Sequence, residues 1–355
     1  MRFLCKRGLI GEKGVQNTGR GSDLSNRLQS CSTHSFHQHA EKKMSNQSTV
    51  TEFLLMGFYD TRELQIFHFM VFLGIYLAAV VGNFLIIVII AVSNHLHTPM
   101  YFFLMNLSIL DLSTVSVTLP KSMANFLLNT TAISYSGCVA QVFFFHVFGA
   151  ADLALLTVMA YDRYIAICKP LHYRTIMKGS TCICMATSAW LSCIPYSALH
   201  TGNIFHLSFC KSNIIDQFFC EVPQLLKLSC SDSYFNEVGV LAFSFLLVVI
   251  CFAFISMSYI QIFTVVLKIP VKEKQHKIFS TCIPHLIVVF LFVSTGSFAY
   301  LKPVSNSPSA LDLTASLLYS VLPPVINPVI YTMRNNDIKG AMRKLTDHKI
   351  LYRNK

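Results

Sequence analysis

The sequence predicts an all-α membrane protein: a seven-transmembrane helix bundle followed by a short amphipathic cytoplasmic helix 8. Of the 355 residues, 53% are hydrophobic and only 13% are charged, and long apolar segments alternate with short basic connections. Soluble domains carry about 25% charged residues, so the composition excludes an ordinary soluble fold. Each apolar segment is long enough to span about 30 Å of hydrocarbon. The segments cover residues 67–92, 101–124, 138–164, 182–202, 235–266, 278–301 and 311–333.

The parts outside these segments have distinct characters. Residues 335–345 are polar and basic with apolar residues at helical spacing, which predicts an amphipathic helix on the membrane surface. Residues 1–43 are polar and basic and contain no apolar run suited to a signal peptide. We expect them to be a disordered extension and Met44 to be the working start. The expected organisation is thus an extension at 1–43, an extracellular N-terminus at 44–66, the seven-helix domain at 67–333, and helix 8 with the tail at 334–355.

The basic residues predict the orientation in the membrane. The connections after the third and fifth segments, together with the tail as far as residue 344, hold eleven Lys and Arg, whereas the alternate connections hold four, partly offset by acids. The positive-inside rule therefore puts the N-terminus outside and the C-terminus in the cytoplasm. The sequons at Asn46 and Asn129 fall on the outer side and are candidate glycosylation sites. Because the basic residues lie in short loops rather than on one face, nucleic acid is not an expected partner.

A charged triplet, Asp162-Arg163-Tyr164, stands where the third segment meets a basic connection. A charge in hydrocarbon costs several kcal/mol, so ionisable residues at such a place are generally paired and functional. An Arg that snorkels from a helix end is the simpler alternative. We expect Arg163 to be bonded to Asp162 and to be released when the protein switches state.

Two acids, Asp111 and Asp152, lie well inside the second and third segments. Two nearby carboxylates cannot both stay ionised without a cation or a shared proton. We therefore expect a site for Na⁺ or a proton between them, the alternative being two separately neutral, hydrogen-bonded side chains. No other cofactor is expected, and no Cys/His group has the spacing of a zinc site.

The seventh segment contains Asn327-Pro328-x-x-Tyr331. Proline removes an amide donor and frees a carbonyl, which predicts a kink. The hydroxyls of Tyr331 and of Tyr259 in the fifth segment are candidates to receive Arg163 after release. An ordinary proline kink is the alternative.

Twelve cysteines divide into two groups. Those within apolar runs, among them Cys182, Cys184, Cys193 and Cys251, are expected to be small core residues. Those beside polar connections are disulfide candidates if that side is oxidising. They are Cys138, Cys210, Cys220 and Cys230.

Four motifs together resemble the signature set of the vertebrate olfactory receptors, a branch of the rhodopsin-like class A G-protein-coupled receptors. They are PMYFFLMNLSILD at 99–111, MAYDRYIAIC at 159–168, KIFSTCIPHL at 277–286 and PVINPVIY at 324–331. The resemblance covers about 44–350. Three residues depart from it: Pro284 stands where Ser is usual, Asp152 where Glu is common, and Val293 where Tyr is usual.

The resemblance implies an odorant receptor of the plasma membrane and no enzymatic activity. It implies disulfides Cys138–Cys220 and Cys210–Cys230, which hold a long outer loop as a lid over a ligand pocket. The pocket would take a small, mostly hydrophobic volatile molecule. Its implied lining is Phe145, His146, Gly149, Ala150, Val222, Phe243, Leu247, Val293, Gly296, Ser297 and Tyr300.

The resemblance also implies the signalling partner, the α subunit of a stimulatory, olfactory-type heterotrimeric G protein, with a rise in cyclic AMP. Membrane lipid is the other expected partner. On activation the sixth segment would swing outward while His285 and Tyr259 exchange partners. The implied switch residues are Asp162, Arg163, Tyr164, Tyr259, His285, Asn327, Pro328 and Tyr331.

Three other functions are alternatives to this one. Internal repeats and several intramembrane charges along a path would indicate a transporter or channel. The sequence has one acidic pair and no repeat. An intramembrane hydrolase is not favoured, because the sequence around His146 and His285 has neither the spacing of a nucleophile site nor that of a zinc site. The nearest competitor is a class A receptor for a non-odorant ligand. An amine receptor normally has an acid where Phe145 stands.

Overall fold

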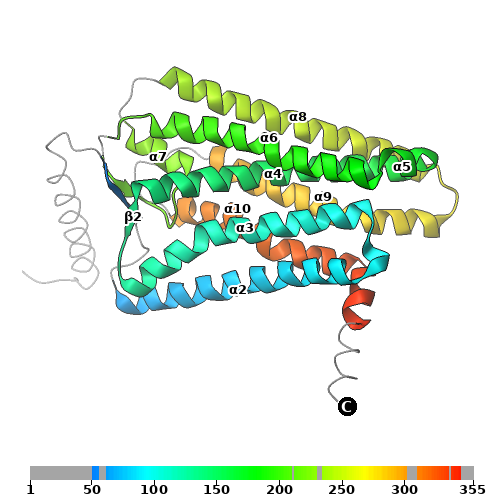
Figure 1. Cartoon of the computed structure of the whole chain (residues 1–355), viewed down its shortest axis with the longest axis horizontal. Helices are drawn as coiled ribbons and strands as arrows, with labels where there is room; N and C mark the ends of the chain where they lie inside the picture. The colour runs from blue at the N-terminus through cyan, green and yellow to red at the C-terminus, as the bar shows by residue number, and fades with distance from the viewer. Residues whose placement is uncertain are drawn as a thin grey trace, which may run out of the picture. The chain divides into compact units, whose positions relative to one another are not determined.

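The long helices form a bundle, as the sequence predicts (Figure 1). The computed structural model describes residues 50–55, 61–209, 212–229, 234–301, 310–335 and 337–344. Within these residues, seven helices are long and apolar enough to cross a membrane. They are α2 (Arg62–Val92), α3 (Pro99–Leu128), α4 (Tyr135–Cys168), α6 (Gly179–Phe205), α8 (Tyr234–Leu267), α9 (Lys272–Leu301) and α10 (Ala310–Arg334).

Local chemistry sets the helix ends. Pro99 begins α3, where its missing N–H costs nothing and its fixed φ suits the first turn. Asn129 ends α3 in the left-handed region with φ 51°, which Asn tolerates better than most residues. Ser134 caps α4, because its Oγ accepts a hydrogen bond from the Gly137 N–H at 3.1 Å. Short helices fill three connections: η1 (Asn94–Leu96), α5 (Pro170–Ile176) and α7 (Val222–Leu228).

The fourth spanning segment, the least clear in the sequence, is a continuous helix of 27 residues with Pro195 in its interior. Expectations for the cysteines hold in part. Cys182 and Cys193 are buried, but Cys184 is exposed and Cys251 is half-buried, so these two are not core residues. Periodicity could not separate inward from outward faces here, because a spanning helix is apolar on both.

A small sheet covers one end of the bundle. Strand β1 (Glu52–Leu55) is central, antiparallel to β2 (Ala132–Ser134) on one side and parallel to β3 (Ile214–Ile215) on the other. The N–H of Leu54 donates to Asn213 O, and that of Leu55 donates to Thr131 O, both at 2.8 Å. The segment before the first helix is therefore held between two later connections.

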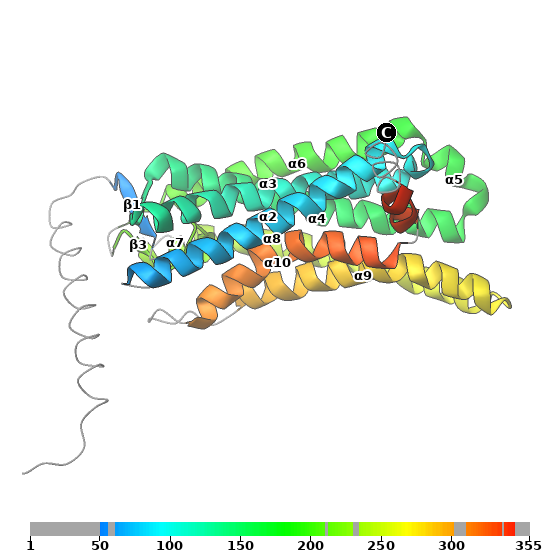
Figure 2. The same cartoon turned by 90° about the horizontal axis from the view of Figure 1, so that it is seen from below.

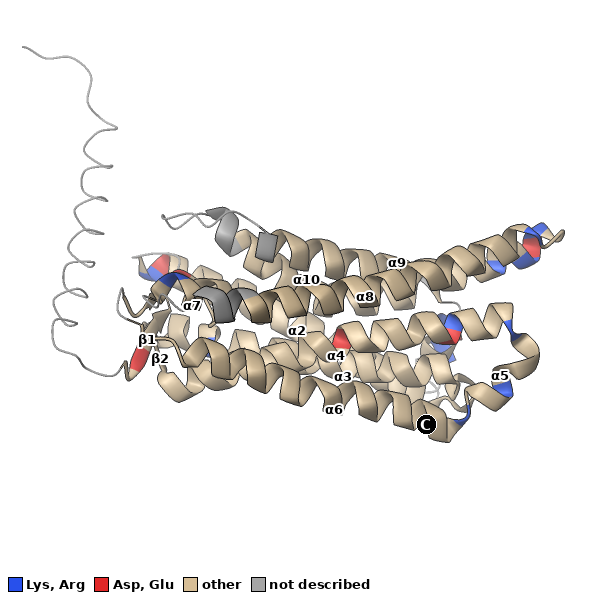
Figure 3. Cartoon of the chain, turned by 90° about the horizontal axis from the view of Figure 1, so that it is seen from above, with Lys and Arg blue, Asp and Glu red and all other residues tan. Residues whose placement is uncertain are grey.

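Helix α4 occupies the middle of the bundle and contacts α3, α6, α8 and α9 (Figure 1). A disulfide joins Cys138 at its first turns to Cys220, with Cα atoms 5.5 Å apart. We call the end that carries this bridge and the sheet the disulfide end. At the opposite end, Lys and Arg gather around α5 and the α8–α9 connection (Figure 3), and we call this the basic end.

Helix α2 meets α10 closely. A Cβ at Gly82 would lie 3.1 Å from the Cβ of Pro328, so glycine permits this approach. Next to it, Asn83 is buried, and its Nδ2 donates to Pro324 O at 2.8 Å. That carbonyl has lost its usual helical donor because Pro328 has no N–H. Helix α10 contains Pro323, Pro324 and Pro328, and it bends along its length (Figure 2).

Residues 337–344 form the expected amphipathic helix. The Oδ1 of Asn335 accepts hydrogen bonds from the N–H groups of Asp337 and Ile338 and so caps its start. Ile338 and Ala341 are buried against the main core, whereas Met342 is partly exposed. The hydroxyl of Tyr101 donates to Asp337 at 3.0 Å, which ties this helix to the start of α3.

Candidate functional site

Residues 206–209 and 212–229 belong to the connection between α6 and α8, which we call the lid. A buried glutamine fixes the lid at the disulfide end. Gln141 of α4 donates from Nε2 to Val117 O on α3 at 2.9 Å, and its Oε1 accepts from the Cys220 N–H at 2.8 Å. The disulfide to Cys138 holds the same point of the lid covalently. The implied Cys138–Cys220 bridge is therefore confirmed. The implied Cys210–Cys230 bridge and the Asn46 sequon lie outside the described residues.

A second contact fastens the lid to α10. The carboxylate of Glu221 is buried and accepts hydrogen bonds from the hydroxyls of Ser316 and Tyr319. The ring of Tyr319 also packs edge-on against Phe145 of α4, with centroids 5.6 Å apart. Phe219 of the lid packs against the same Phe145 ring at 5.4 Å. One lid segment therefore touches two helices that flank the expected pocket.

The expected pocket residues fall into several environments. Phe145 lies in the aromatic cluster just described, and Val222 is buried in the core beneath the sheet. At Gly149 and Gly296 no atom lies within 4 Å of where a Cβ would stand, so both face open space. Ala150 and Val293 pack against the main core, Phe243, Leu247 and Ser297 are exposed, and the side chain of Tyr300 lies outside the described residues.

A histidine pair gives this region its polar character. The rings of His146 and His200 stack with centroids 5.4 Å apart. His146 Nδ1 donates to Val142 O at 2.9 Å, because a carbonyl can only accept. The hydroxyl of Ser244 on α8 donates to its own helix, so its oxygen accepts from His200 Nε2. His200 was not predicted, although a histidine within an apolar segment is itself a signal.

The acid site lies where α3, α4 and α10 meet. Asp111 is buried, and both of its carboxylate oxygens accept from Asn327 Nδ2, at 3.3 and 3.0 Å. Asp152 is near enough for its charge and that of Asp111 to interact. Within the described residues, its Oδ1 is buried without a hydrogen-bond partner. Carboxylate and amide oxygens are the donors that hard cations prefer, so these residues fit Na⁺.

The expected Asp162–Arg163 pair is wrong for this conformation. Within the part of the chain that is described, Arg163 has neither an ion pair nor a hydrogen bond, whereas Asp162 accepts from the Tyr173 hydroxyl at 3.0 Å. Neighbouring residues on a helix point about 100° apart, so their side chains do not face each other. Burial, followed by the charge of Asp162, raises the pKa of Tyr173, so its hydroxyl stays a donor at neutral pH. Tyr164, the third residue of the triplet, has the Nζ of Lys169 5.7 Å from the centre of its ring.

A buried histidine joins three helices about two helical turns from Arg163 along α4. His285 Nε2 of α9 donates to Leu156 O of α4 at 3.0 Å, since the carbonyl must accept. In a neutral imidazole Nδ1 is then an acceptor, and Tyr259 of α8 donates to it at 2.8 Å. The expected exchange of partners thus starts from a conformation in which these two residues are already bonded. The Tyr331 hydroxyl is buried and has no partner among the described residues.

Comparisons with known proteins agree with this geometry. A family model described as olfactory receptor matches residues 72–349. Human olfactory receptor 14I1 is 53% identical over 302 residues, which cover 85% of this chain and 97% of that protein. Mouse olfactory receptor 1E16 is 44% identical over 300 residues, 84% and 96% of the two chains. Squid rhodopsin has a TM-score of 0.64 at 15% identity, covering 85% and 92%, which shows the shared fold.

Seven apolar helices, a bridge between α4 and the lid, and these relatives together establish a multi-pass membrane protein that is not an enzyme. The chain belongs to the olfactory receptor family of G-protein-coupled receptors.

Proposed function

We propose that this chain is an odorant receptor of the plasma membrane, with its N-terminus outside and its C-terminus in the cytoplasm. Two features at opposite ends support this orientation. The Cys138–Cys220 bridge suits an oxidising exterior, and the basic end suits the cytoplasmic surface. An epitope tag placed before Glu52 should be stained on intact cells, and staining only after permeabilisation would overturn the orientation.

The ligand is a small, mostly hydrophobic volatile molecule held beneath the lid. The open space at Gly149 and Gly296 supports this position, and nearby Phe145 offers an apolar surface. The polar handle is His146, whose Nδ1 is occupied by Val142 O, so that Nε2 is the nitrogen that faces a guest. A neutral Nε2 in this tautomer accepts a hydrogen bond, so alcohols are favoured over ketones and ethers.

The observation that carries the switch is the chain of bonds from Tyr259 through His285 to Leu156. It ties α8 and α9 to α4 next to Arg163. An outward movement of α9 must break at least the bond to Leu156. Arg163, which has no partner among the described residues, then meets the Tyr331 and Tyr259 hydroxyls and lines a cavity for the G-protein α subunit.

The test is a screen of a diverse odorant panel on cells that express residues 44–355, read as cyclic AMP. At least one odorant should raise cyclic AMP in a dose-dependent way through a stimulatory G protein. The Arg163→Ala variant should reach the surface at normal levels and lose this response, while Arg174→Ala, on the exposed side of α5, should keep it. A full response from Arg163→Ala would refute the switch.

A further inference from the structure

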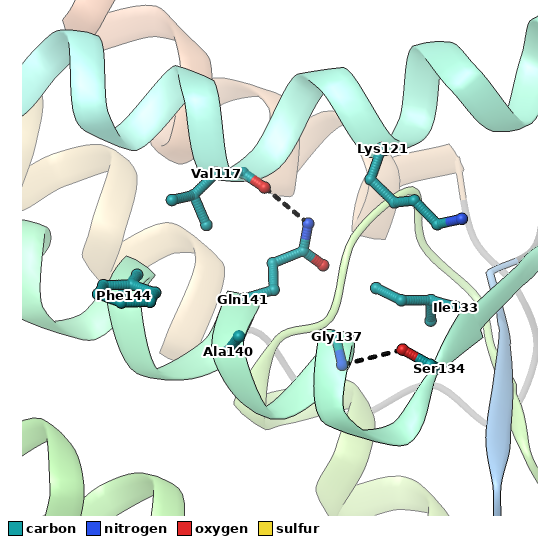
Figure 4. A pocket seen from close by; sticks show the side chains of 8 residues that line it. All are labelled: Val117, Lys121, Ile133, Ser134, Gly137, Ala140, Gln141 and Phe144. Atoms are coloured by element: carbon teal, nitrogen blue, oxygen red, sulfur yellow. Dashed lines mark hydrogen bonds between the residues drawn. The ribbon is translucent and has the colours of Figure 1, made fainter.

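A groove lies between α3 and α4 near the disulfide end (Figure 4). Its volume is about 460 Å³, within the range of ligand sites. It shares no residue with the expected odorant pocket. Its lining is Val117, Lys121, Ile133, Ser134, Gly137, Ala140, Gln141 and Phe144.

The groove holds a cation that the fold does not pair. Lys121 has no hydrogen bond or ion pair among the described residues. It stands seven to eight residues beyond the middle of α3 (Pro99–Leu128), a rise of about 11 Å. The half-thickness of a bilayer's hydrocarbon is about 15 Å, so the ammonium reaches headgroup depth only by extending its stem. At headgroup depth the ammonium meets lipid phosphates, which are anions from outside the protein.

Below Lys121 the walls become apolar. Val117 lies one helical turn deeper on α3, and Phe144 lies deeper on α4 with 46% of its surface exposed. The back wall is Gln141, whose amide is held in place because it donates to Val117 O and accepts from the Cys220 N–H. Figure 4 shows Lys121 extending from α3 toward the Ser134 end and Phe144 at the other end.

The upper rim also favours negative charge. It is the first turn of α4, where helix N–H groups carry partial positive charge. Ser134 and Gly137 form this rim. The groove thus has positive charge at its upper end and apolar walls below. A molecule with an anionic head and a hydrocarbon chain complements this arrangement.

We propose that this groove binds one glycerophospholipid from the leaflet on the disulfide side, with its phosphate at Lys121 and one acyl chain along Val117 and Phe144. The groove opens sideways at an exposed Phe144, so a lipid enters from the bilayer without crossing water. Because Gln141 is both the back wall and the anchor of Cys220, a bound lipid also stiffens the attachment of the lid.

The experiment uses the full chain in nanodiscs of phosphatidylcholine that carries a photoactivatable diazirine in one acyl chain. Peptides that contain Phe144 should be labelled above the level of peptides that contain Phe245, an exposed Phe of α8 at similar depth. Lys121→Gln should lower this labelling about tenfold, because the phosphate loses a hydrogen bond from a charged donor. Ala140→Trp, which fills the groove from an exposed position, should abolish it, and Lys121→Arg should retain it.

The matched control is Lys169→Gln, an exposed lysine at the basic end, which should leave the labelling unchanged. Equal labelling of Phe144 and Phe245 peptides, insensitive to Lys121→Gln, would overturn the proposal in favour of ordinary lipid contact. A photoactivatable fatty acid that displaces phosphatidylcholine from the groove at low membrane content would overturn the choice of phospholipid. Recovery of the Cys138–Cys220 bridge in each variant reports correct folding.

Discussion

Replacing Phe53 by Ala should loosen the central strand of the small sheet. Phe53 is 0% exposed and packs on three aromatic rings: Tyr135, Phe205 and Phe209, with centroids 6.0, 6.5 and 5.5 Å away. A buried Phe→Ala change costs about 3–5 kcal/mol, through lost transfer energy and the cavity left behind. Each 1.4 kcal/mol is about a factor of ten, so local opening should become roughly a hundred- to several-thousand-fold more frequent.

Hydrogen exchange measures this opening directly. The N–H groups of Leu54 and Leu55 are bonded within the sheet, so a peptide over 50–55 should lose most of its protection. Peptides from the middle of α3 should be unaffected, because Phe53 belongs to the separate core at the disulfide end. The control is Glu52→Ala, whose side chain is exposed one residue earlier. Unchanged exchange in the Phe53→Ala variant would refute the view that this ring holds the strand.

Three further predictions follow from the site. Tyr173→Phe removes a hydrogen bond to a charged partner, worth about 1.5–3 kcal/mol, and should raise ligand-independent cyclic AMP per surface receptor; an unchanged basal level contradicts the role of this bond. If Na⁺ binds at Asp152, replacing choline chloride with NaCl should raise the Tm of the wild-type protein but not of Asp152→Asn; an equal rise in both would exclude the site. The double variant Cys138→Ser/Cys220→Ser should lose about 2–4 kcal/mol of stability, seen as a lower Tm in detergent, and a Tm equal to wild type would argue against it.

The bundle could be predicted because length and apolarity suffice to define a spanning helix. The sequence also marked Asp111, Asn327 and His285, since polar groups within apolar runs must find partners inside the bundle. The sequence could not define which residue each of these polar side chains bonds to. Asp162 is bonded to Tyr173 of a loop helix rather than to its sequence neighbour, and this depends on how α5 packs.

The lid shows the same limit more sharply. The strands of the small sheet, of which only β3 lies in the lid, have two to four residues, too few for a sequence period to identify them. In the sequence, Glu221 counts merely as an acid in an outer connection, whereas in the fold it is buried under two hydroxyls of α10. His200 is different, because its isolated position in a spanning segment could have identified it beside His146.

The order of synthesis gives the three-stranded sheet a further meaning. β1 leaves the ribosome first, yet β2 follows only after two long helices, and β3 only after four. Strand β1 therefore remains unpaired with β2 and β3 while the first four spanning helices are inserted into the membrane. Closure of the sheet therefore depends on the earlier insertion of α2, α3, α4 and α6, so it is a late step in the assembly of the bundle.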